Sequence, residues 1–400
     1  TSDIEENEDE EDVTLRARDA ESILDLCLAI RRLADETEVT VADEAGLTLI
    51  GYALIADPMK PQVRETVAAL KAHGLFQILD IVPNHMGIMG ADNAWWLDVL
   101  ENGPASPWSV FFDIDWEPLN PELTGKVLLP LLGDHYGKVL NRGELLLDYD
   151  APRGQFSVYY YQHRLPIDPA TYPRIVGHRS ERLAAVLGNH AERYGELQTL
   201  LTAFGHLPER NDTNPQRMTE RQRDKEVHKH QLAALSEVCA DIAQHIADNL
   251  AEFNGHPGHP ASFDLLHELM QNQGYRLAYW RVASDEINYR RFFDVNDLAA
   301  LRMEDAAVFD ATHRLVLDLV AQGKVDGLRI DHPDGLYDPA MYFRRLQLAV
   351  GGRSPAVGES LPLYLVIEKI LAAHERRLQT SIIVREHGEH ERIETVQRPG

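Results

Sequence analysis

The sequence predicts an α/β protein with a parallel sheet, because an amphipathic helix followed by a short buried strand recurs along the chain. Three copies of this unit are visible, and in each the apolar strand ends beside a carboxylate. Helices that alternate with buried strands are typical of parallel βα architecture. The first two carboxylates lie about 250 residues apart, which is far more than one crossover needs. We therefore also expect a large insertion.

The first copy combines a helical pattern over residues 63–70 with a glycine, Gly74, that can end the helix. The apolar run 75–82 follows and carries Asp80 near its end. This copy predicts one strand of the parallel sheet with a carboxylate at its C-terminal end.

The second and third copies lie close together in the sequence. A helix over residues 315–320 ends near Gly323, and the strand 325–330 leads to Asp331. The strand 364–367 leads to Glu368 after about forty residues, the length of one strand, helix and return. The two strands should therefore be neighbours.

The stretch between the copies predicts the insertion. Residues 180–252 are rich in Ala, Leu, Glu, Gln and Arg, which favour long helices, while Pro208 and Pro215 interrupt the run. We expect an acidic tail over 1–15, the first part of a barrel with a loop subdomain over 16–170, a mainly helical insertion over 171–290, the second part of the barrel over 291–371 and an atypical C-terminal tail over 372–400.

Composition narrows the class of function. The 400 residues are 44% hydrophobic and 26% charged, as in ordinary globular proteins, and the net charge of −25 argues against nucleic acid as a partner. A neutral substrate fits better. The two cysteines, Cys27 and Cys239, form neither a disulfide framework nor a metal-binding pair. With no long apolar run in the sequence, we expect a cytoplasmic protein that does not enter a membrane. We also expect no cofactor and no metal, because no set of metal ligands can be assembled from the spacing of the residues.

A parallel barrel would bring the ends of its strands to one mouth. The polar residues at the ends of the predicted strands, or just beyond them, are Asp80, Asn84, His85, Arg329, Asp331, His332 and Glu368. Two carboxylates on adjacent strands suggest glycoside cleavage with retention, in which they lie about 5 Å apart. Asp331 would attack the anomeric carbon, Arg329 would keep it ionised, and Glu368 would protonate the leaving oxygen.

Three motifs resemble the first conserved regions of the α-amylase superfamily. They are Asp80-Ile-Val-Pro-Asn84-His85, Gly327-Leu-Arg329-Ile-Asp331-His332 and Val366-Ile-Glu368-Lys369. Further stretches at 91–100, 111–116, 126–130, 279–281, 287–294 and 331–339 narrow the resemblance to maltooligosyl trehalose synthases. The resemblance runs from about residue 57 to 371.

The resemblance implies a (β/α)8 TIM-type barrel of glycoside hydrolase family 13. It also implies conversion of the reducing-end α-1,4 bond of a maltooligosaccharide into an α,α-1,1 bond, by intramolecular transglycosylation. Its substrate-binding candidates here are Tyr52, Asp80, Asn84, His85, Trp95, Trp96, Tyr289, Arg290, His332 and Lys369. Aromatic residues such as Trp95 and Trp96 are more often part of a core than a sugar platform. The oligomeric state stays open.

The sequence departs from this family at both ends. Around Tyr52 the family's neighbouring His and Asp are missing, and no His-Asp pair that could supply a third catalytic carboxylate follows Glu368. We expect an incomplete barrel and slow turnover by this polypeptide alone. An α-glucan hydrolase or 4-α-glucanotransferase and a noncatalytic glucan-binding remnant are the alternatives.

Overall fold

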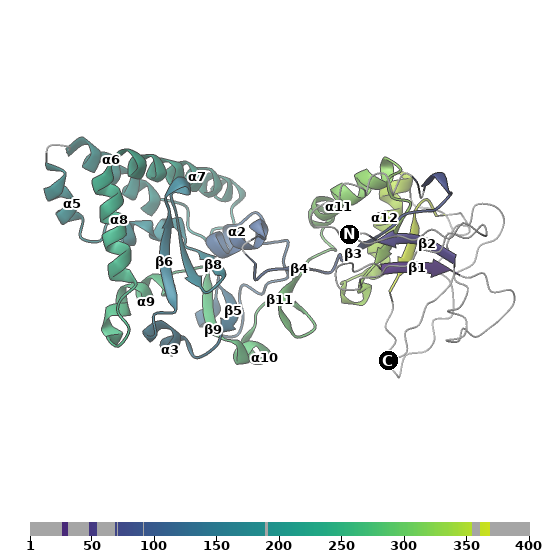
Figure 1. Cartoon of the computed structure of the whole chain (residues 1–400), viewed down its shortest axis with the longest axis horizontal. Coiled ribbons are helices and arrows are strands. Elements are labelled where there is room, and N and C mark those ends of the chain that lie inside the picture. Colours follow the sequence, from purple (N-terminus) through teal and green to yellow (C-terminus); the bar gives the residue numbers. More distant parts are fainter. Residues whose placement is uncertain are drawn as a thin grey trace, which may run out of the picture. The chain divides into compact units, whose positions relative to one another are not determined.

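The computed structural model describes residues 26–30, 48–53, 69, 71–90, 92–188, 191–353 and 361–368. The chain divides into two compact units, whose elements are labelled in Figure 1. Unit 1 comprises Thr1–Pro83 and Phe309–Gly400, and unit 2 comprises Asn84–Val308. The predicted tails at 1–15 and 372–400 lie outside the described residues.

Unit 1 contains the predicted parallel sheet. Its strands are β3 (Ile78–Ile81), β12 (Gly327–Ile330) and β13 (Tyr364–Ile367), in the order β13-β12-β3, and both pairs are parallel. Leu328 and Ile330 are fully buried, which explains why this apolar run occupies the central strand. The remaining strands, β1 (Leu26–Ile30) and β2 (Thr48–Ala53), form an antiparallel pair. The α/β class is confirmed, but the sheets of the described residues do not close into a barrel.

Two helices flank the central strand of unit 1 in the sequence. The helix α11 (Ala306–Ala321) begins in the last residues of unit 2 and precedes β12, and Gly323 follows it with a positive φ of 63°, as predicted for its end. The helix α12 (Pro339–Gly351) connects β12 to β13. The Asp338 side chain caps its first turn, and Gly352 ends it in a left-handed conformation.

The side chain of Gln347 fixes α12 to the start of β13. Its amide nitrogen donates to the carbonyl oxygen of Leu363, and its oxygen accepts from the Leu363 N–H. Between β12 and β13, a Cβ added at Gly327 would lie 2.7 Å from a ring carbon of Tyr364. Only glycine allows β12 and β13 this close approach.

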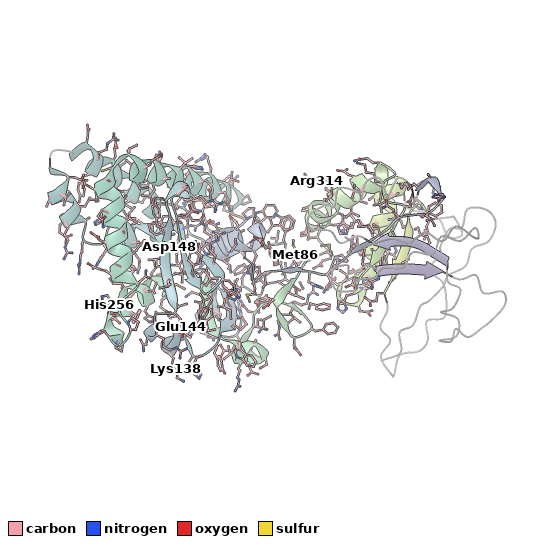
Figure 2. The ribbon with its side chains drawn as sticks, viewed as in Figure 1. Met86, Lys138, Glu144, Asp148, His256 and Arg314 are labelled. Atoms are coloured by element: carbon pink, nitrogen blue, oxygen red, sulfur yellow. The ribbon has the colours of Figure 1, made fainter. Side chains whose placement is uncertain are left out.

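The described residues of unit 2 form three further sheets. The antiparallel strands β4 (His85–Gly87), β11 (Val295–Ala300) and β10 (Arg291–Phe292) form one, and β5 (Val127–Leu132) pairs in parallel with β9 (Tyr275–Tyr279). The third is an antiparallel meander of β6 (Leu145–Asp150), β7 (Gln155–Tyr160) and β8 (His163–Pro166). Along β6, Leu145 and Leu147 are buried while Leu146 and Asp148 are exposed, an alternation typical of a sheet with one wet face. Asp148 is labelled in Figure 2.

The helices of unit 2 confirm the expected helical character of residues 180–252. They are α5 (Ser180–Val186), α6 (Ala191–Gly205), α7 (Pro215–Val238) and α8 (Ala240–Phe253), and no strand occurs among the described residues of this stretch. The predicted break is also present, because Asn214 caps α7 and Pro215 is its first residue. Shorter helices complete the unit: α2 (Ala94–Asn102), α3 (Tyr136–Asn141), α4 (Tyr172–Val176), α9 (Asp264–Gln271) and α10 (Ala283–Glu286).

The expected boundaries of the insertion differ from those of the compact unit. We expected it to start at residue 171 and end at 290, but unit 2 extends from Asn84 to Val308 and includes the three sheets. The helices contact these sheets, for example α8 on β6 (Figure 1). The helical stretch therefore contacts strands that precede it in the sequence.

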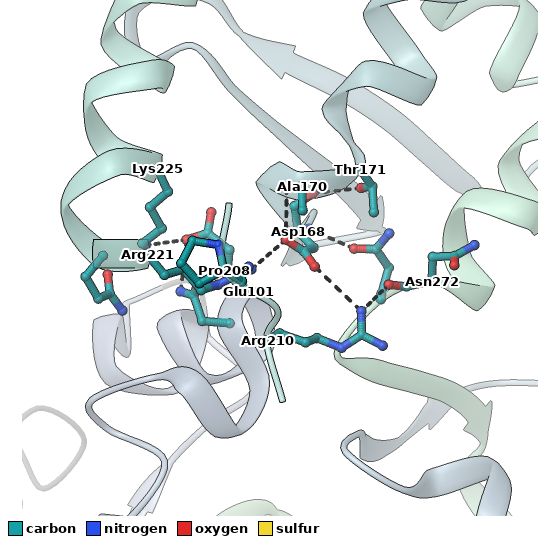
Figure 3. Close-up of polar contacts among 12 residues, drawn as sticks. Glu101, Asp168, Ala170, Thr171, Pro208, Arg210, Arg221, Lys225 and Asn272 are labelled. Carbon is teal, nitrogen blue, oxygen red and sulfur yellow. Dashed lines mark hydrogen bonds and ion pairs between the residues drawn. The ribbon is translucent and has the colours of Figure 1, made fainter. Parts of the chain in front are cut away.

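A network of buried charges holds α7 against the rest of unit 2 (Figure 3). Arg221 is 0% exposed. Its guanidinium donates to Asp168 Oδ1 at 2.6 Å, to Asn102 Oδ1 at 3.0 Å and to the carbonyl oxygen of Pro208 at 2.6 Å. The side chain of Arg210 lies 3.6 Å from the other Asp168 oxygen. Every charge at this point therefore has an opposite charge beside it.

One turn and two turns further along α7, two lysines continue the same face of the helix. Lys225 Nζ lies 2.6 Å from Glu101 Oε2 and 3.0 Å from Asp98 Oδ1, and Lys229 also contacts Glu101. Burial alone would raise the pKa of Glu101, but the two ammonium groups outweigh it and lower this pKa to about 2. Both lysines also pair with Glu226, at 3.0 Å and 3.3 Å. The α7 network is the set of these residues with Arg221, Arg210 and Asp168.

In the described part of the chain, no helix is long and apolar enough to cross a membrane.

Candidate active site

The parallel sheet of unit 1 places the two predicted catalytic carboxylates next to each other. Asp331 directly follows β12, and its N–H donates to the carbonyl oxygen of Ile81 on β3 at 3.0 Å. Glu368 directly follows β13, and its N–H donates to the carbonyl oxygen of Ile330 at 3.1 Å. The prediction that they end adjacent parallel strands is confirmed. The strand ladder thus continues up to both residues and fixes their backbones.

Arg329 binds three carboxylates at once. Nη1 lies 2.6 Å from Asp80 Oδ2 and 3.0 Å from Asp331 Oδ1, and Nη2 lies 3.1 Å from Glu368 Oε2. The four side chains are partly exposed to solvent. We call these four residues the Arg329 cluster. A guanidinium suits this position because its planar set of donors can serve several oxygens.

Asp331 and Glu368 lie close enough for each carboxyl group to shift the pKa of the other, and both lie against the Arg329 guanidinium. Carboxyl groups that interact this strongly fit the spacing of about 5 Å in retaining glycosidases better than the roughly 6.5–9.5 Å that inverting ones need for a water molecule. Two carboxyl groups this close share a proton, because two negative charges in contact repel.

The surroundings assign that proton to Glu368. The hydrogen bond to Asp331 raises the pKa of Glu368, and burial and the negative charge of Asp331 add to this effect. For Asp331 burial acts in the same direction, but the hydrogen bond from Glu368 and the Arg329 cation outweigh it, so that its pKa lies below the usual value. Within the pair, Asp331 therefore loses its proton first and Glu368 keeps its proton to higher pH.

Asp80 is the third carboxylate of the Arg329 cluster. Burial raises its pKa, with a smaller contribution from the charge of Asp331, while Arg329 acts in the opposite direction. Its Oδ1 is buried and has no hydrogen-bond partner among the described residues. Register explains the contact with Arg329, because the two residues are directly paired across β3 and β12.

His332 has an unusual backbone immediately after Asp331. Its φ of 46° and ψ of 52° are left-handed, although it is neither glycine nor asparagine and precedes Pro333. Its backbone N–H donates to the carboxylate of Glu368. Strained backbone of this kind is held only where the surrounding structure demands it, and it often occurs at functional sites.

Two other predicted site residues, Arg290 and Asn84, form a polar group with Asp113 within unit 2. Arg290 Nε lies 2.8 Å from Asp113 Oδ2, and its Nη1 donates to Asn84 Oδ1 at 3.2 Å. The ring of His85 packs against Phe292 with centroids 4.2 Å apart. Asp113 was missed in the sequence, where only its place in a family-like stretch marked it. It binds Arg302 as well, at 3.4 Å.

Three aromatic candidates lie in the packing of unit 2. Trp96 is 1% exposed and meets the rings of Phe112 and Tyr289 edge to face, and Tyr289 is itself 4% exposed. Trp95 stacks on Trp108 with centroids 4.7 Å apart. Trp96 and Tyr289 offer no open ring face to a sugar, so the structure gives them the core role that was the alternative.

Two predicted residues cannot be placed. Tyr52 belongs to β2 and pairs with Cys27, but its side chain lies outside the description. Lys369 lies outside the described residues.

Proteins similar to this chain carry the name of the family that its motifs resemble. No family model matches the sequence. Proteins of two Mycobacterium tuberculosis strains, both named as maltooligosyl trehalose synthases, are 30% identical over 309 residues, or 77% of this chain. This chain spans 25% of their length.

Solved structures of similar proteins carry the same name. The maltooligosyltrehalose synthase of Arthrobacter ramosus is 29% identical, with 79% of this chain and 27% of that chain covered and a TM-score of 0.46. A hypothetical maltooligosyl trehalose synthase of Sulfolobus tokodaii is 23% identical, with 80% and 28% covered and a TM-score of 0.44.

The resemblance seen in the motifs is therefore borne out by sequence identity: about three quarters of this chain aligns with about one quarter of the length of proteins named maltooligosyl trehalose synthase.

Proposed function

We propose that this chain carries the nucleophile and the acid of a retaining enzyme that converts the reducing-end α-1,4 bond of a maltooligosaccharide into an α,α-1,1 bond. The observation that carries the proposal is that Asp331 and Glu368 follow adjacent parallel strands and bind the same guanidinium, with pKa values that shift in opposite directions. A pair of titratable groups with such different surroundings marks an acid and a nucleophile. The similarity to maltooligosyl trehalose synthases supplies the substrate class.

The first step breaks the α-1,4 bond. Asp331 attacks the anomeric carbon of the second glucose from the reducing end, and a covalent glycosyl ester forms. Glu368 gives its proton to the leaving oxygen, which departs as the 4-hydroxyl of the terminal glucose. Retaining glycosidases divide these roles in the same way.

The second step forms the new bond. The released glucose turns within the site, and its anomeric hydroxyl attacks the glycosyl ester while Glu368, now ionised, takes the proton. Asp331 is released as a carboxylate, and the product has no reducing end. Water must be kept out between the two steps, since it would otherwise hydrolyse the ester.

Arg329 is a positioning residue in this proposal. Its charge keeps Asp331 ionised, and its two nitrogens fix the spacing of the two carboxyl groups. We also propose that β3, β12 and β13, with α11 and α12, are part of a (β/α)8 barrel of the α-amylase type. The boundaries predicted for its two parts, 16–170 and 291–371, remain part of this proposal, as does a cytoplasmic location.

A product assay on maltopentaose tests the proposal. A nonreducing pentasaccharide that disappears in Asp331→Asn would support it. Shorter reducing sugars would point to a hydrolase or 4-α-glucanotransferase, and no product together with retained binding would point to a glucan-binding remnant. We expect low rates, because the 400-residue polypeptide has no His-Asp pair after Glu368, and one missing electrostatic contribution typically costs about 10²–10³ in rate.

A further inference from the structure

Asp80 differs from the two proposed reacting carboxylates in its place along the strands. It lies within β3 and is paired with Arg329 of β12 in the parallel ladder. Asp331 and Glu368 instead follow the ends of β12 and β13. The side chain of Arg329 therefore has Asp80 beside it on the neighbouring strand, and the reacting pair beyond it at the strand ends.

The guanidinium of Arg329 divides its donors between Asp80 and the reacting pair. Nη1 carries two N–H groups. It donates to Asp80 Oδ2 at 2.6 Å and to Asp331 Oδ1 at 3.0 Å, while Nη2 lies 3.1 Å from Glu368 Oε2. Asp80 thus occupies one of the two N–H groups of Nη1, through the shorter of the two hydrogen bonds. It competes with Asp331 for the same nitrogen.

The carboxylate of Asp80 is directed at Arg329 rather than at solvent. Oδ1 is buried without a hydrogen-bond partner among the described residues, and Oδ2 is the atom bound to the guanidinium. Burial raises the pKa of Asp80, and the charge of Asp331 adds to this effect, while Arg329 opposes it. Since the repulsion between two anions acts on both, the Asp80 anion also opposes the ionisation of Asp331.

We propose that Asp80 is a positioning residue of the reaction: it anchors Nη1 of Arg329 and takes up part of the guanidinium charge, so that Asp331 and Glu368 share only the remainder. The inference rests on the proposed function for the identity of the reaction. It gives Asp80 a role that acts through Arg329, in place of the substrate contact expected from its motif.

A titration tests the charge effect without any turnover. The carboxyl carbon of Glu368 is followed by NMR in the 400-residue chain labelled with ¹³C-glutamate, and its signal is identified by its absence in Glu368→Gln. Asp80→Asn keeps an oxygen that accepts from Nη1 but removes the negative charge. We expect the Glu368 midpoint to move to lower pH by about 0.5–1 unit, because a repulsion is lost and more of the Arg329 charge acts on the pair.

Asp326→Asn is the matched control at the other end of the same strand. Asp326 directly precedes β12, accepts from the Gln77 N–H at 2.8 Å and lies 3.7 Å from Lys71 Nζ. Its variant removes the same charge from unit 1 away from the guanidinium, so the Glu368 midpoint should stay where it is in the parent chain. His332, whose charge lowers the pKa of Asp331, is unchanged in both variants.

Turnover of maltopentaose tests the anchoring effect. Asp80→Ala and Asp80→Asn remove the same charge, but only Asn keeps an acceptor for Nη1. We expect Asp80→Ala to lower kcat by about 10- to 100-fold with KM changed less than about twofold, because a displacement of about 1 Å in a positioning group has a cost of this size. Asp80→Asn should restore most of kcat, with a pH profile displaced to lower pH.

The inference would be overturned by a Glu368 midpoint that is unchanged or raised in Asp80→Asn, or that moves equally in Asp326→Asn. Equal losses of kcat in Asp80→Asn and Asp80→Ala with an unmoved pH profile would also overturn it, since they would reduce Asp80 to a structural part. A lowered midpoint in a chain that forms no product would support the charge effect while contradicting the proposed function.

Discussion

The Arg329 cluster of unit 1 and the α7 network of unit 2 use the same kinds of side chain for different ends. In the α7 network four cations, Arg210, Arg221, Lys225 and Lys229, face the four carboxylates of Asp98, Glu101, Asp168 and Glu226. In the Arg329 cluster a single cation faces three carboxylates.

The difference in charge balance has a consequence for protonation. In the α7 network the numbers of positive and negative charges match, so Glu101 stays ionised at pH values well below its usual pKa. In the Arg329 cluster one guanidinium is shared by three acids, so Asp331 is favoured as an anion while the pKa of Glu368 and that of Asp80 are raised. The balanced charges of the α7 network hold its carboxylates in the ionised form. The excess of acids in the Arg329 cluster leaves a carboxyl group that can give up or take a proton.

The largest effect should come from breaking the α7 network at its most buried cation. Arg221→Met leaves the Asp168 carboxylate buried with the Ala170 N–H at 3.0 Å and only the longer ion pair to Arg210. Removal of one partner from a buried ion pair typically costs about 3–5 kcal/mol. We expect urea unfolding to show a loss of this size.

Arg223→Met is the matched control on the same helix. Arg223 is exposed and paired only with Asp224 among the contacts of the described chain. Surface pairs contribute little to stability, so the midpoint should not move. Equal losses in the two variants would show that α7 itself, rather than the buried charge, is sensitive to substitution.

The next effect concerns pH. The pKa of Glu101 is lowered from 4.5 to about 2 in the folded chain. The stability it contributes is therefore present above pH 4.5 and is lost as the pH falls towards 2, by about 3 kcal/mol in total. We expect Glu101→Gln to flatten the acid limb of the unfolding free energy. Parallel curves for the variant and the parent chain would contradict this.

A smaller effect of opposite pH dependence is expected from Arg329→Met. Without the cation the three acids repel, which raises their folded pKa values above the unfolded ones. Their favourable contribution is then present at low pH and lost as the pH rises through the folded pKa values. The variant should be about 1–2 kcal/mol less stable at pH 7 and nearly equal to the parent chain near pH 4.

Arg329→Lys is the control for that variant, since it keeps the charge but not the planar set of donors. Its pH dependence should stay close to that of the parent chain. A difference between Met and parent that does not change with pH would show that packing, rather than charge, is lost.

Local pattern predicted the parallel sheet well. The strand 364–367 matches β13, and the apolar run 325–330 contains β12, because strands buried on both faces leave a continuous apolar signal. The contact between Asp331 and Glu368 followed from strand adjacency. The three-acid arrangement around Arg329 did not, since it depends on the register that pairs Arg329 with Asp80.

Long-range packing decided what the sequence could not. A tryptophan pair looks the same whether it meets a sugar or a core, and only the packing of Trp96 on Phe112 separates the two. The α7 network did leave a signal, because Arg221, Lys225 and Lys229 recur every four residues on one helical face. Their buried partners on α2 are more than a hundred residues away, and no local pattern identifies them.

The role of Asp331 as nucleophile is tested most directly by trapping the glycosyl ester. A fluorinated α-glucosyl fluoride needs no protonation of its leaving group, so it can react without the acid, and its ester is slow to hydrolyse. Mass spectrometry of the digested chain should find one glucosyl adduct, on the peptide that contains Asp331. The adduct should persist in Glu368→Gln and be absent in Asp331→Asn. An adduct on Asp80 or Glu368, or one that survives Asp331→Asn, would contradict the assignment.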